Sequence, residues 1–419
     1  MDFFRMGDSE VAPFIAFLAS MNREERGRLI SDPSFCLFLF RLFSPSTQSL
    51  ILSLIWDSTQ LIRIDERIEP DISCVTLLEQ LDIVLQNGVN NTKILNPIFR
   101  RGYLSGALEG SHRSSRFVPI NSEKDIDKKK KKDKDVVKKS NERWECLLRF
   151  LALPSESTVQ NVSSTTRDVL NHAGFTSGHG TDIEITSKGF QFLLLSPVKQ
   201  IWSYMIELLK METREGRSVK ELLDVLLRMA LCIHSEPENK KYEVDNSWTE
   251  RQCNFVTHLR ELGLIFIRKR KDGFFYLTPN LANLCLANHD DSLTKKSGSI
   301  IVETNFRVYA YTSSSLQLAI LSSFTCMTYR FHDMSVGILT RDSVRKALQV
   351  GITANQIISF LKTNCHPESL STSLPIPITV SDQIRLWEDE RKRLIYQEAA
   401  LYSSFESEKV SWIKYICII

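Results

Sequence analysis

Residues 255–280 read FVTHLRELGLIFIRKRKDGFFYLTPN, and the hydrophobic pattern of this stretch changes halfway along it. Apolar residues first recur at helical spacing and stop at Gly263, a residue type that commonly follows a helix end. Two β-rich runs follow, and the Asp272-Gly273 pair between them is a hairpin signal. The order of helix, two-stranded wing and helix predicts a winged-helix unit over residues 211–290.

The chain before this unit predicts a helical module over residues 1–110. Asp32-Pro33 and Ser44-Pro45 each place an N-cap side chain before a proline at the first helical position. Amphipathic stripes precede and follow these two helix starts.

A lysine-rich stretch comes next, over residues 111–141. It has no apolar periodicity and contains Lys128 to Lys132 beside alternating acids, so it predicts a charged flexible linker. The lysine run is either a nuclear import signal or part of a solvated linker, and the sequence favours neither.

The fold class that these patterns predict is mainly α and multi-domain. The remaining boundaries are a winged-helix-like unit over 142–210, a linker over 291–299, an α+β domain over 300–367, a linker with a charged helix over 368–405, and a divergent tail over 406–419.

Composition limits what the protein can be. At 419 residues, 42% hydrophobic and 25% charged, the chain is typical of a soluble protein of several domains. No apolar run reaches the ~18 residues of a membrane span. The N-terminus does not resemble a signal peptide, and the nine cysteines form no C-x-x-C pair, which favours a reducing compartment.

Charge argues against a free-standing nucleic-acid-binding protein. The net charge is +3, but residues 123–139 carry +4, so the rest of the chain sums to −1. Protein partners are the better expectation. The basic run Arg268, Lys269, Arg270 and Lys271 on the predicted wing is therefore interpreted first as a solvated hairpin tip and second as an auxiliary DNA contact.

Signatures of catalysis are missing from the sequence. It contains no phosphate-binding glycine motif, no His-Glu-x-x-His and no Gly-x-Ser-x-Gly, and its near pairs of cysteine and histidine lack zinc spacing. We therefore expect no catalytic residue, no cofactor and no metal.

Five strings of the sequence resemble one family. They are ILNPIFR at 94–100, ITSKGFQFLLL at 185–195, HLRELGL at 258–264, VETNFRVYAYT at 302–312 and DQIRLWE at 382–388. The family is that of the TFIIH subunit called p-fifty-two in animals and Tfb-two in yeast, and the resemblance extends from about residue 35 to residue 405.

The resemblance implies a nuclear, non-catalytic scaffold that anchors the XPB translocase, supports its ATPase, and serves promoter opening and nucleotide excision repair. It implies that the α+β domain is a clutch that pairs with XPB, while the N-terminal parts contact other core subunits. The residues expected at the XPB interface are Val302, Tyr309 and Tyr311 on a strand pair, Arg330 and Phe331 in a loop, and Trp387 on the charged helix.

The chain departs from the family after residue 405. Because residues 406–419 are too few for a further domain, we expect the family's terminal domain to be missing, and binding to the smallest TFIIH subunit to be lost. The alternative function is that of a winged-helix DNA-binding transcription regulator.

Overall fold

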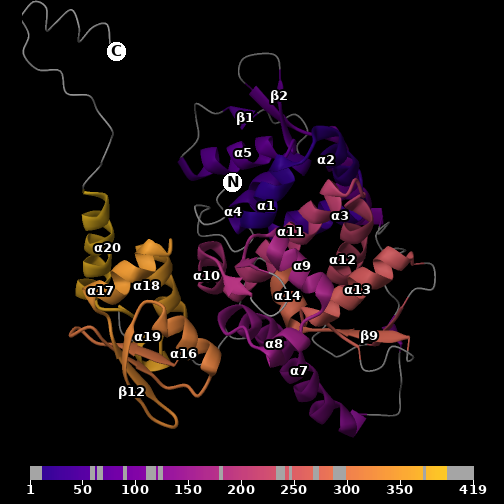
Figure 1. Cartoon of the computed structure of the whole chain (residues 1–419). Coiled ribbons are helices and arrows are strands. Elements are labelled where there is room, and N and C mark those ends of the chain that lie inside the picture. The colour runs from indigo at the N-terminus through magenta and orange to yellow at the C-terminus, as the bar shows by residue number, and fades with distance from the viewer. Residues whose placement is uncertain are drawn as a thin grey trace, which may run out of the picture.

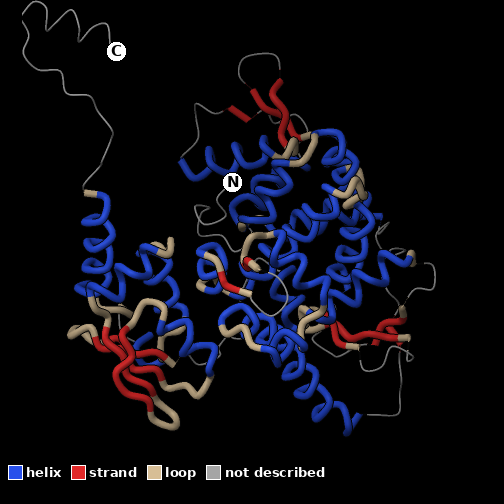
Figure 2. Tube along the Cα trace, in the orientation of Figure 1, coloured by secondary structure: helices blue, strands red, loops and turns tan. Residues whose placement is uncertain are grey.

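The computed structural model describes residues 12–56, 62–63, 69–87, 92–109, 119–120, 126–178, 183–232, 241–244, 248–267, 273–285, 299–370 and 374–393. This part of the chain is mainly helical, as predicted, with small antiparallel sheets (Figure 2). A larger helical body, coloured indigo to salmon in Figure 1, lies beside a smaller sheet-and-helix domain formed by residues 299–393.

The described residues of the N-terminal module form six α-helices and a short π-helix, Ser105–Glu109. α3 and α4 begin at Pro33 and Pro45, which confirms the two predicted helix starts, and Asp32 Oδ1 accepts from Ser34 N at 2.8 Å. The helices are α1 (Ala12–Ser20), α2 (Arg23–Ile30), α3 (Pro33–Leu42), α4 (Pro45–Trp56), α5 (Glu69–Gln80) and α6 (Pro97–Leu104).

The prediction that this module is wholly helical is wrong, because it also contains a three-stranded sheet. The strands lie in the order β1 (Ile62–Arg63), β3 (Thr92–Leu95) and β2 (Val84–Asn87). α5 ends before Asp82, whose positive φ of 56° turns the chain. Asp82 also binds the buried Arg26, which donates to Leu18 O and Ala19 O at the end of α1. This contact with a distant helix stops α5 where the local pattern did not.

The predicted linker over 111–141 is also corrected, because α7 spans Ile126–Ala152 as one helix. The helix is held by the body from Val136 onward, where Val136 and Trp144 are buried. Ser140 Oγ donates to Gly263 O, and Asn280 Nδ2 lies 3.2 Å from Ser140 Oγ. These contacts depend on residues more than a hundred positions away, so composition alone could not reveal them.

Two helix-hairpin-helix segments follow in the predicted order. The first is α8 (Glu156–Gln160), α9 (Ser164–His172), β5 (Thr176–Ser177), β6 (Glu184–Ile185) and α10 (Ser187–Leu193), which leads into α11 (Pro197–Arg214) and α12 (Lys220–Cys232). The second is α13 (Glu250–Glu261), β8 (Ile265–Phe266), β9 (Phe274–Leu277) and α14 (Pro279–Cys285). Two further strands extend this hairpin into a four-stranded sheet, in the order β4 (Pro119–Ile120), β7 (Lys241–Glu243), β9 and β8.

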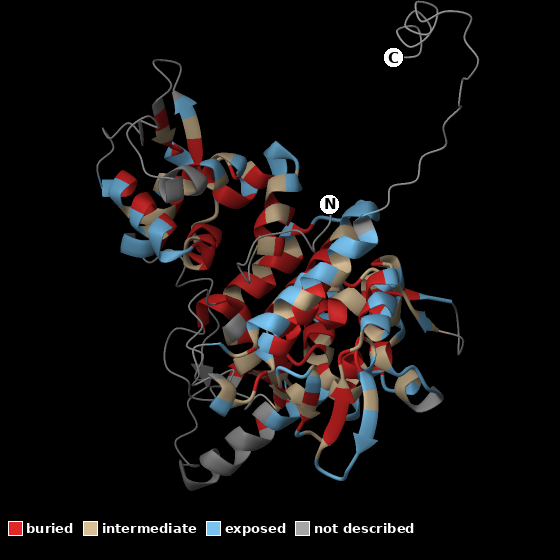
Figure 3. Ribbon diagram, turned by 90° about the vertical axis from the view of Figure 1, so that its left-hand side faces the viewer, coloured by how far each residue is buried: buried red, intermediate tan, exposed pale blue. Residues whose placement is uncertain are grey.

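α11 is the central helix of the body. All residues from Ile201 to Leu209 are buried, so the helix is covered on every side (Figure 3 shows buried residues in red). It packs against α1, α9 and α14. Trp202 stacks on Phe14 of α1 with ring centroids 4.3 Å apart, which joins the N-terminal module to the rest of the body.

A buried polar pair lies between α11 and α13. Tyr204 Oη and His258 Nε2 are 2.8 Å apart, and both residues are almost completely buried. Burial lowers the pKa of His258 from 6.5 to about 4, although the nearby Glu261 carboxylate opposes this shift. Glu261 accepts hydrogen bonds from Ser163 and Thr166 at the start of α9, so the polar network ties the two helix-hairpin-helix segments together.

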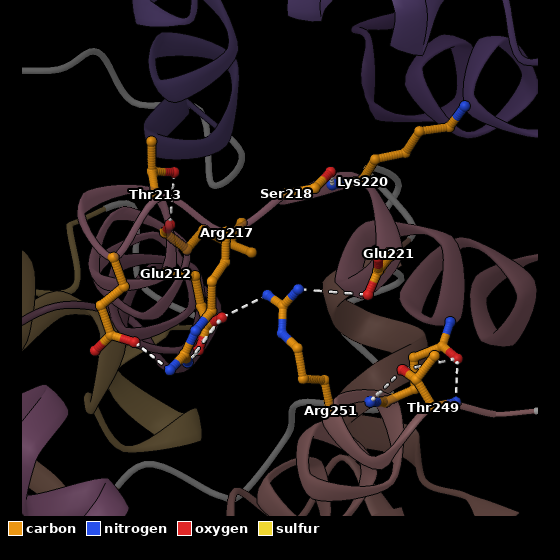
Figure 4. Close-up of polar contacts among 11 residues, drawn as sticks. Glu212, Thr213, Arg217, Ser218, Lys220, Glu221, Thr249 and Arg251 are labelled. Atoms are coloured by element: carbon orange, nitrogen blue, oxygen red, sulfur yellow. Dashed lines mark hydrogen bonds and ion pairs between the residues drawn. The ribbon is translucent and has the colours of Figure 1, made fainter.

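Three helix ends meet in a charged clasp. Arg251, near the start of α13, donates to Glu212 Oε2 on α11 at 2.6 Å and to Glu221 Oε2 on α12 at 3.4 Å (Figure 4). Arg217 approaches the same Glu212 at 3.3 Å. Because Glu212 is only 13% exposed and Arg251 31%, these charges are partly shielded from water.

The sheet-and-helix domain contains the strands β10 (Ile300–Val302), β11 (Arg307–Ala310), β12 (Cys326–Arg330) and β13 (Ser335–Ile338), and the helices α16 (Ser315–Ser322), α17 (Arg341–Gln349), α18 (Ala354–Thr363), α19 (Pro367–Leu370) and α20 (Ile378–Lys392). It meets the helical body where α16 packs against α7 and where Gln191 Nε2 donates to Gly351 O. No helix in the described residues is long and apolar enough to cross a membrane.

Replacing Arg251 should loosen the clasp. We expect Arg251→Gln to lower the free energy of unfolding by about 1–2 kcal/mol, because it leaves the shielded Glu212 with fewer partners. Urea denaturation of the full chain measures this. The matched control is Arg385→Gln, which breaks an exposed pair with Asp382 within one helix and should change stability by less than about 0.5 kcal/mol. Equal effects of the two variants would contradict the role of the clasp.

The buried His258 should make stability fall with acidification. Its pKa is lower in the folded chain, so the unfolded chain binds more protons, and stability is lost as the pH falls from 6.5 to about 4. The loss should reach about 3 kcal/mol at most. The variant His258→Gln does not titrate at this position, so its free energy of unfolding should lack this loss between pH 6.5 and about 4. An unchanged pH profile would show that His258 is not the group responsible.

Candidate partner-binding surface

The four-stranded sheet has two different faces. Its strand order is β10-β11-β13-β12, and all neighbours are antiparallel. Directly opposite residues in paired strands lie on one face of a sheet, so the register assigns each side chain to a face. Val302 pairs with Val308, which pairs with Gly337, and all three are buried. They belong to the face that packs against the helices.

The prediction that Val302 lies at the interface is therefore corrected. Its side chain is only 6% exposed and joins a core that includes Phe324 and Phe360, whose rings meet edge to face at 5.9 Å. The alternating apolar pattern identified the strand correctly. It could not say which of its two faces the helices would cover, and Val302 points into the core.

The opposite face, called the outer face below, carries a row of four paired residues. Ile301 pairs with Tyr309, Tyr309 with Val336, and Val336 with Tyr329. Tyr309 is half-buried, and its hydroxyl lies 3.4 Å from Glu303 Oε2. The row thus runs across every strand of the sheet and ends at an exposed aromatic ring.

Exposed aromatic side chains gather at the β12 side of this face. Tyr329 is 65% exposed and Phe331 is 56% exposed, and their rings stack with centroids 6.4 Å apart. Tyr311, two residues beyond Tyr309, is 50% exposed but lies away from β12, beside His366, with ring centroids 6.2 Å apart. A stacked pair of large exposed aromatics, such as Tyr329 and Phe331, is typical of protein-binding surfaces rather than of a solvated face.

The sheet also has one open edge within the described residues. β12 pairs with β13 on one side, and no described strand pairs with it on the other. A register shift between Met327 and Tyr329 forms a bulge, and Thr328 Oγ1 donates to Val336 O at 3.0 Å. An unpaired edge presents free backbone donors and acceptors that can bind an incoming strand.

The other edge is closed. The chain after α18 runs beside β10, where Ile300 N donates to Asn364 O at 3.0 Å and His366 N donates to Ile300 O at 2.8 Å. Within the described residues, β12 therefore offers a free backbone edge, and the β10–β11 pair does not. Arg330, predicted in a loop, ends strand β12 and is exposed, and Phe331 follows it.

Trp387 lies on α20, which packs against the domain and is not an isolated charged helix. Its ring centroid is 6.0 Å from that of Phe306, and it is only partly exposed. Charged residues around it hold α20 in place: Glu388 Oε2 accepts from Ala354 N at 3.3 Å, and Arg391 donates to Leu348 O. α20 packs against both α17 and α18.

Other predicted features give no site here. Residues 268–272, which include Arg268, Lys269, Arg270 and Lys271, lie outside the described residues. Within the part of the chain that the structure covers, no group of three or more His, Cys, Asp or Glu side chains could hold a metal ion. Tyr329, which sequence analysis missed, has one recognisable signal: Tyr329 and Phe331 alternate with polar residues.

These features define a class of protein: a mainly helical, multi-domain chain with a small sheet domain that exposes an aromatic face and one free edge. The family model described as "Transcription factor Tfb2" matches residues 16–367. A second, "Transcription factor Tfb2 (p52) C-terminal domain", matches residues 382–411. The chain therefore belongs to the Tfb2 family, as the sequence strings indicated.

Curated relatives agree with this assignment. The general transcription factor IIH subunit 4 of Dictyostelium discoideum is 32% identical and covers 93% of this chain and 88% of its own length. The general transcription and DNA repair factor IIH subunit TFB2 of Yarrowia lipolytica is 31% identical, with 91% and 84% covered. The protein of the same name from Saccharomyces cerevisiae is 28% identical, with 94% and 88% covered.

The match over residues 382–411 corrects one prediction. We expected the family's terminal domain to be missing, but the model of that domain recognises this segment, which begins inside α20. The predicted loss of binding to the smallest TFIIH subunit has no remaining basis. Residues 394–419 lie outside the described residues.

The assignment of the two faces makes a stability prediction. Val302→Ala should lower the free energy of unfolding by about 1–2 kcal/mol, because it removes buried methyl groups. Tyr329→Ser should change it by less than about 0.5 kcal/mol, because the ring is largely in water. Chemical denaturation of the full chain tests the pair, and a larger loss for Tyr329→Ser would reverse the two faces.

Proposed function

We propose that this protein is a non-catalytic scaffold subunit of TFIIH, acting in the nucleus in RNA polymerase II initiation and nucleotide excision repair. In this proposal its sheet domain anchors the XPB translocase and stimulates its ATPase. Family membership and the names of the relatives support the complex. The observation that carries the anchoring role is the open β12 edge beside the exposed rings of Tyr329 and Phe331.

In the proposed interface, backbone groups and side chains contribute in different ways. The free edge of β12 offers hydrogen bonds that fix the direction and register of a partner strand. The stacked pair of Tyr329 and Phe331 offers a rigid apolar anchor that loses little conformational entropy on binding. Tyr309 lies on the same face and is separated from Tyr329 by Val336, so a partner that covers this face would also contact Tyr309.

A scaffold role also agrees with the chemistry of the described titratable groups. The buried thiols of Cys36 and Cys285 have pKa values raised to about 12 by burial, so they are protonated and unreactive at neutral pH. The buried His258 pairs with Tyr204 instead of a nucleophile. These buried groups stabilise the core, and in this proposal partners bind at the surface.

Removing the two rings should release the translocase. We expect the double variant Tyr329→Ser/Phe331→Ser to retain less than a tenth of the XPB that the unchanged chain retains after a high-salt wash, because hot-spot aromatics contribute about 2 kcal/mol or more each. Co-expression with XPB, followed by pull-down and quantification of both chains, measures this. ATPase rates of the eluted complexes show whether stimulation falls in parallel.

The matched control is Trp56→Ser, which removes a ring that is 67% exposed on the N-terminal module. It should leave XPB binding unchanged. Binding of the other core subunits to the double variant should also persist, which separates a lost interface from a misfolded chain. Retention of XPB by the double variant at the level of the control would overturn the proposed anchor.

A further inference from the structure

Arg330 ends the edge strand β12 on the side of the sheet that the helices cover. Paired residues share a face, and the register forms a row across the sheet in the order Ile300, Ala310, Ser335 and Arg330. The first three are 2% exposed or less, whereas Arg330 is exposed. A row that belongs to the core in three strands therefore ends in a positive charge at the open edge.

The charge of Arg330 is not neutralised by an acid of its own chain within the described residues. Arg341 of the same domain pairs with Glu390 at 2.7 Å, but Arg330 belongs to no ion pair in this part of the chain. The acid closest to it in sequence, Asp333, lies 2.5 Å from Nδ1 of His332. A partner that covers the edge of β12 therefore meets an uncompensated positive charge.

The bulge in β12 limits the regular part of the edge to the residues around Arg330. Met327 pairs with the buried Gly337, whereas Tyr329 lies on the outer face. The two side chains thus lie on opposite faces although they are two positions apart. A regular strand alternates strictly, so it cannot follow β12 across the bulge. It can pair with Tyr329 to Phe331, and Arg330 is the central residue of that segment.

This arrangement opposes pairing with a second copy of the same strand. In an antiparallel pair with two-fold symmetry, residues equally far from the axis face each other. The register that brings Tyr329 opposite Phe331 of the second copy places Arg330 directly opposite Arg330. Like charges in this position destabilise a strand pair, and bulges and inward-pointing charges are means by which edge strands avoid self-association.

We propose that Arg330 selects the strand that β12 accepts: a strand of a partner protein with a carboxylate opposite the guanidinium, and not a second copy of this chain. The inference rests on the function proposed above, in which β12 binds a strand of its partner. The residues on either side of the carboxylate point to the outer face, where apolar side chains would contact Tyr329 and Phe331.

A carboxylate is the group that this edge requires. An added strand removes water from one side of Arg330, and the neighbouring Ser335 offers no charge in return. The guanidinium stays charged, and its planar set of donors matches the two oxygens of a carboxylate. A neutral strand would leave the charge poorly solvated, and a basic strand would repel it. The partner strand should therefore carry Asp or Glu at this position.

The test uses the chain itself as the source of a strand with a carboxylate. In the variant Arg330→Glu the edge carries a negative charge, so mixing this variant with the unchanged chain brings opposite charges together across the two-fold axis. Fluorescence anisotropy of the labelled variant, titrated with the unlabelled unchanged chain, measures the affinity of the mixed pair. Two further titrations measure each chain against itself. The matched control is Arg345→Glu, which reverses an exposed arginine on α17. Thermal melts show that each variant is folded.

We expect the mixed pair to associate at least about tenfold more tightly than either chain does with itself, because only the mixed pair joins opposite charges. Adding Tyr329→Ser/Phe331→Ser to both chains should abolish this preference, because the contact lies on β12. Equal affinities in the three titrations would overturn the proposal. A preference that the control shares, or that survives the loss of the two rings, would overturn it too.

A pull-down with XPB separates this inference from the proposed anchor. Arg330→Glu should retain less than about a tenth of the XPB that Arg345→Glu retains, because a like charge then faces the partner's carboxylate. If Tyr329→Ser/Phe331→Ser releases XPB and Arg330→Glu does not, the anchor stands and selection by Arg330 is wrong. If XPB binding does not depend on the rings, the anchor fails, and the titrations still decide the role of Arg330.

Discussion

The stacking of Trp202 on Phe14 is the contact on which the helical body depends. α11 is buried on every side from Ile201 to Leu209, so it is stable only when neighbours surround it. Those neighbours are α1, α9 and α14, which come from three different parts of the chain. The N-terminal module and the two helix-hairpin-helix segments therefore share one continuous core, although their boundaries can still be recognised in the sequence.

Local signals predicted the elements that depend on local physics. The proline after Asp32 fixed the start of α3, and the proline after Ser44 fixed the start of α4. The failures occurred where a distant partner decides the outcome. α5 ends early because Asp82 binds Arg26, and α7 is longer than composition suggested because Ser140 is bound to Gly263. Neither contact can be recognised from the sequence on either side of it.

The candidate surface could be predicted from the sequence only in part, because some of its features depend on residues far away in the chain. The sequence placed Tyr309 and Tyr311 on a strand pair, and the structure has Tyr309 in β11 and Tyr311 directly after it. The sequence could not show that the chain after α18 closes the β10 edge, or that Phe306 lies against Trp387. Which edge stays open is a property of the whole sheet, so Tyr329 on β12 was found only from the structure.

Charge is distributed so that the core and the surfaces respond differently to solution conditions. The buried pair of Tyr204 and His258 is neutral at physiological pH, because burial raises the pKa of the hydroxyl and lowers that of the imidazole. The clasp around Arg251 pairs two arginines with two glutamates, so its charges balance, whereas the lysine-rich sequence of residues 123–139 carries a net positive charge. Salt screens exposed charges far more than buried contacts, so ionic strength should adjust what the protein binds while its core stays intact. This separation suits the scaffold role proposed above, in which the fold stays intact while partners bind.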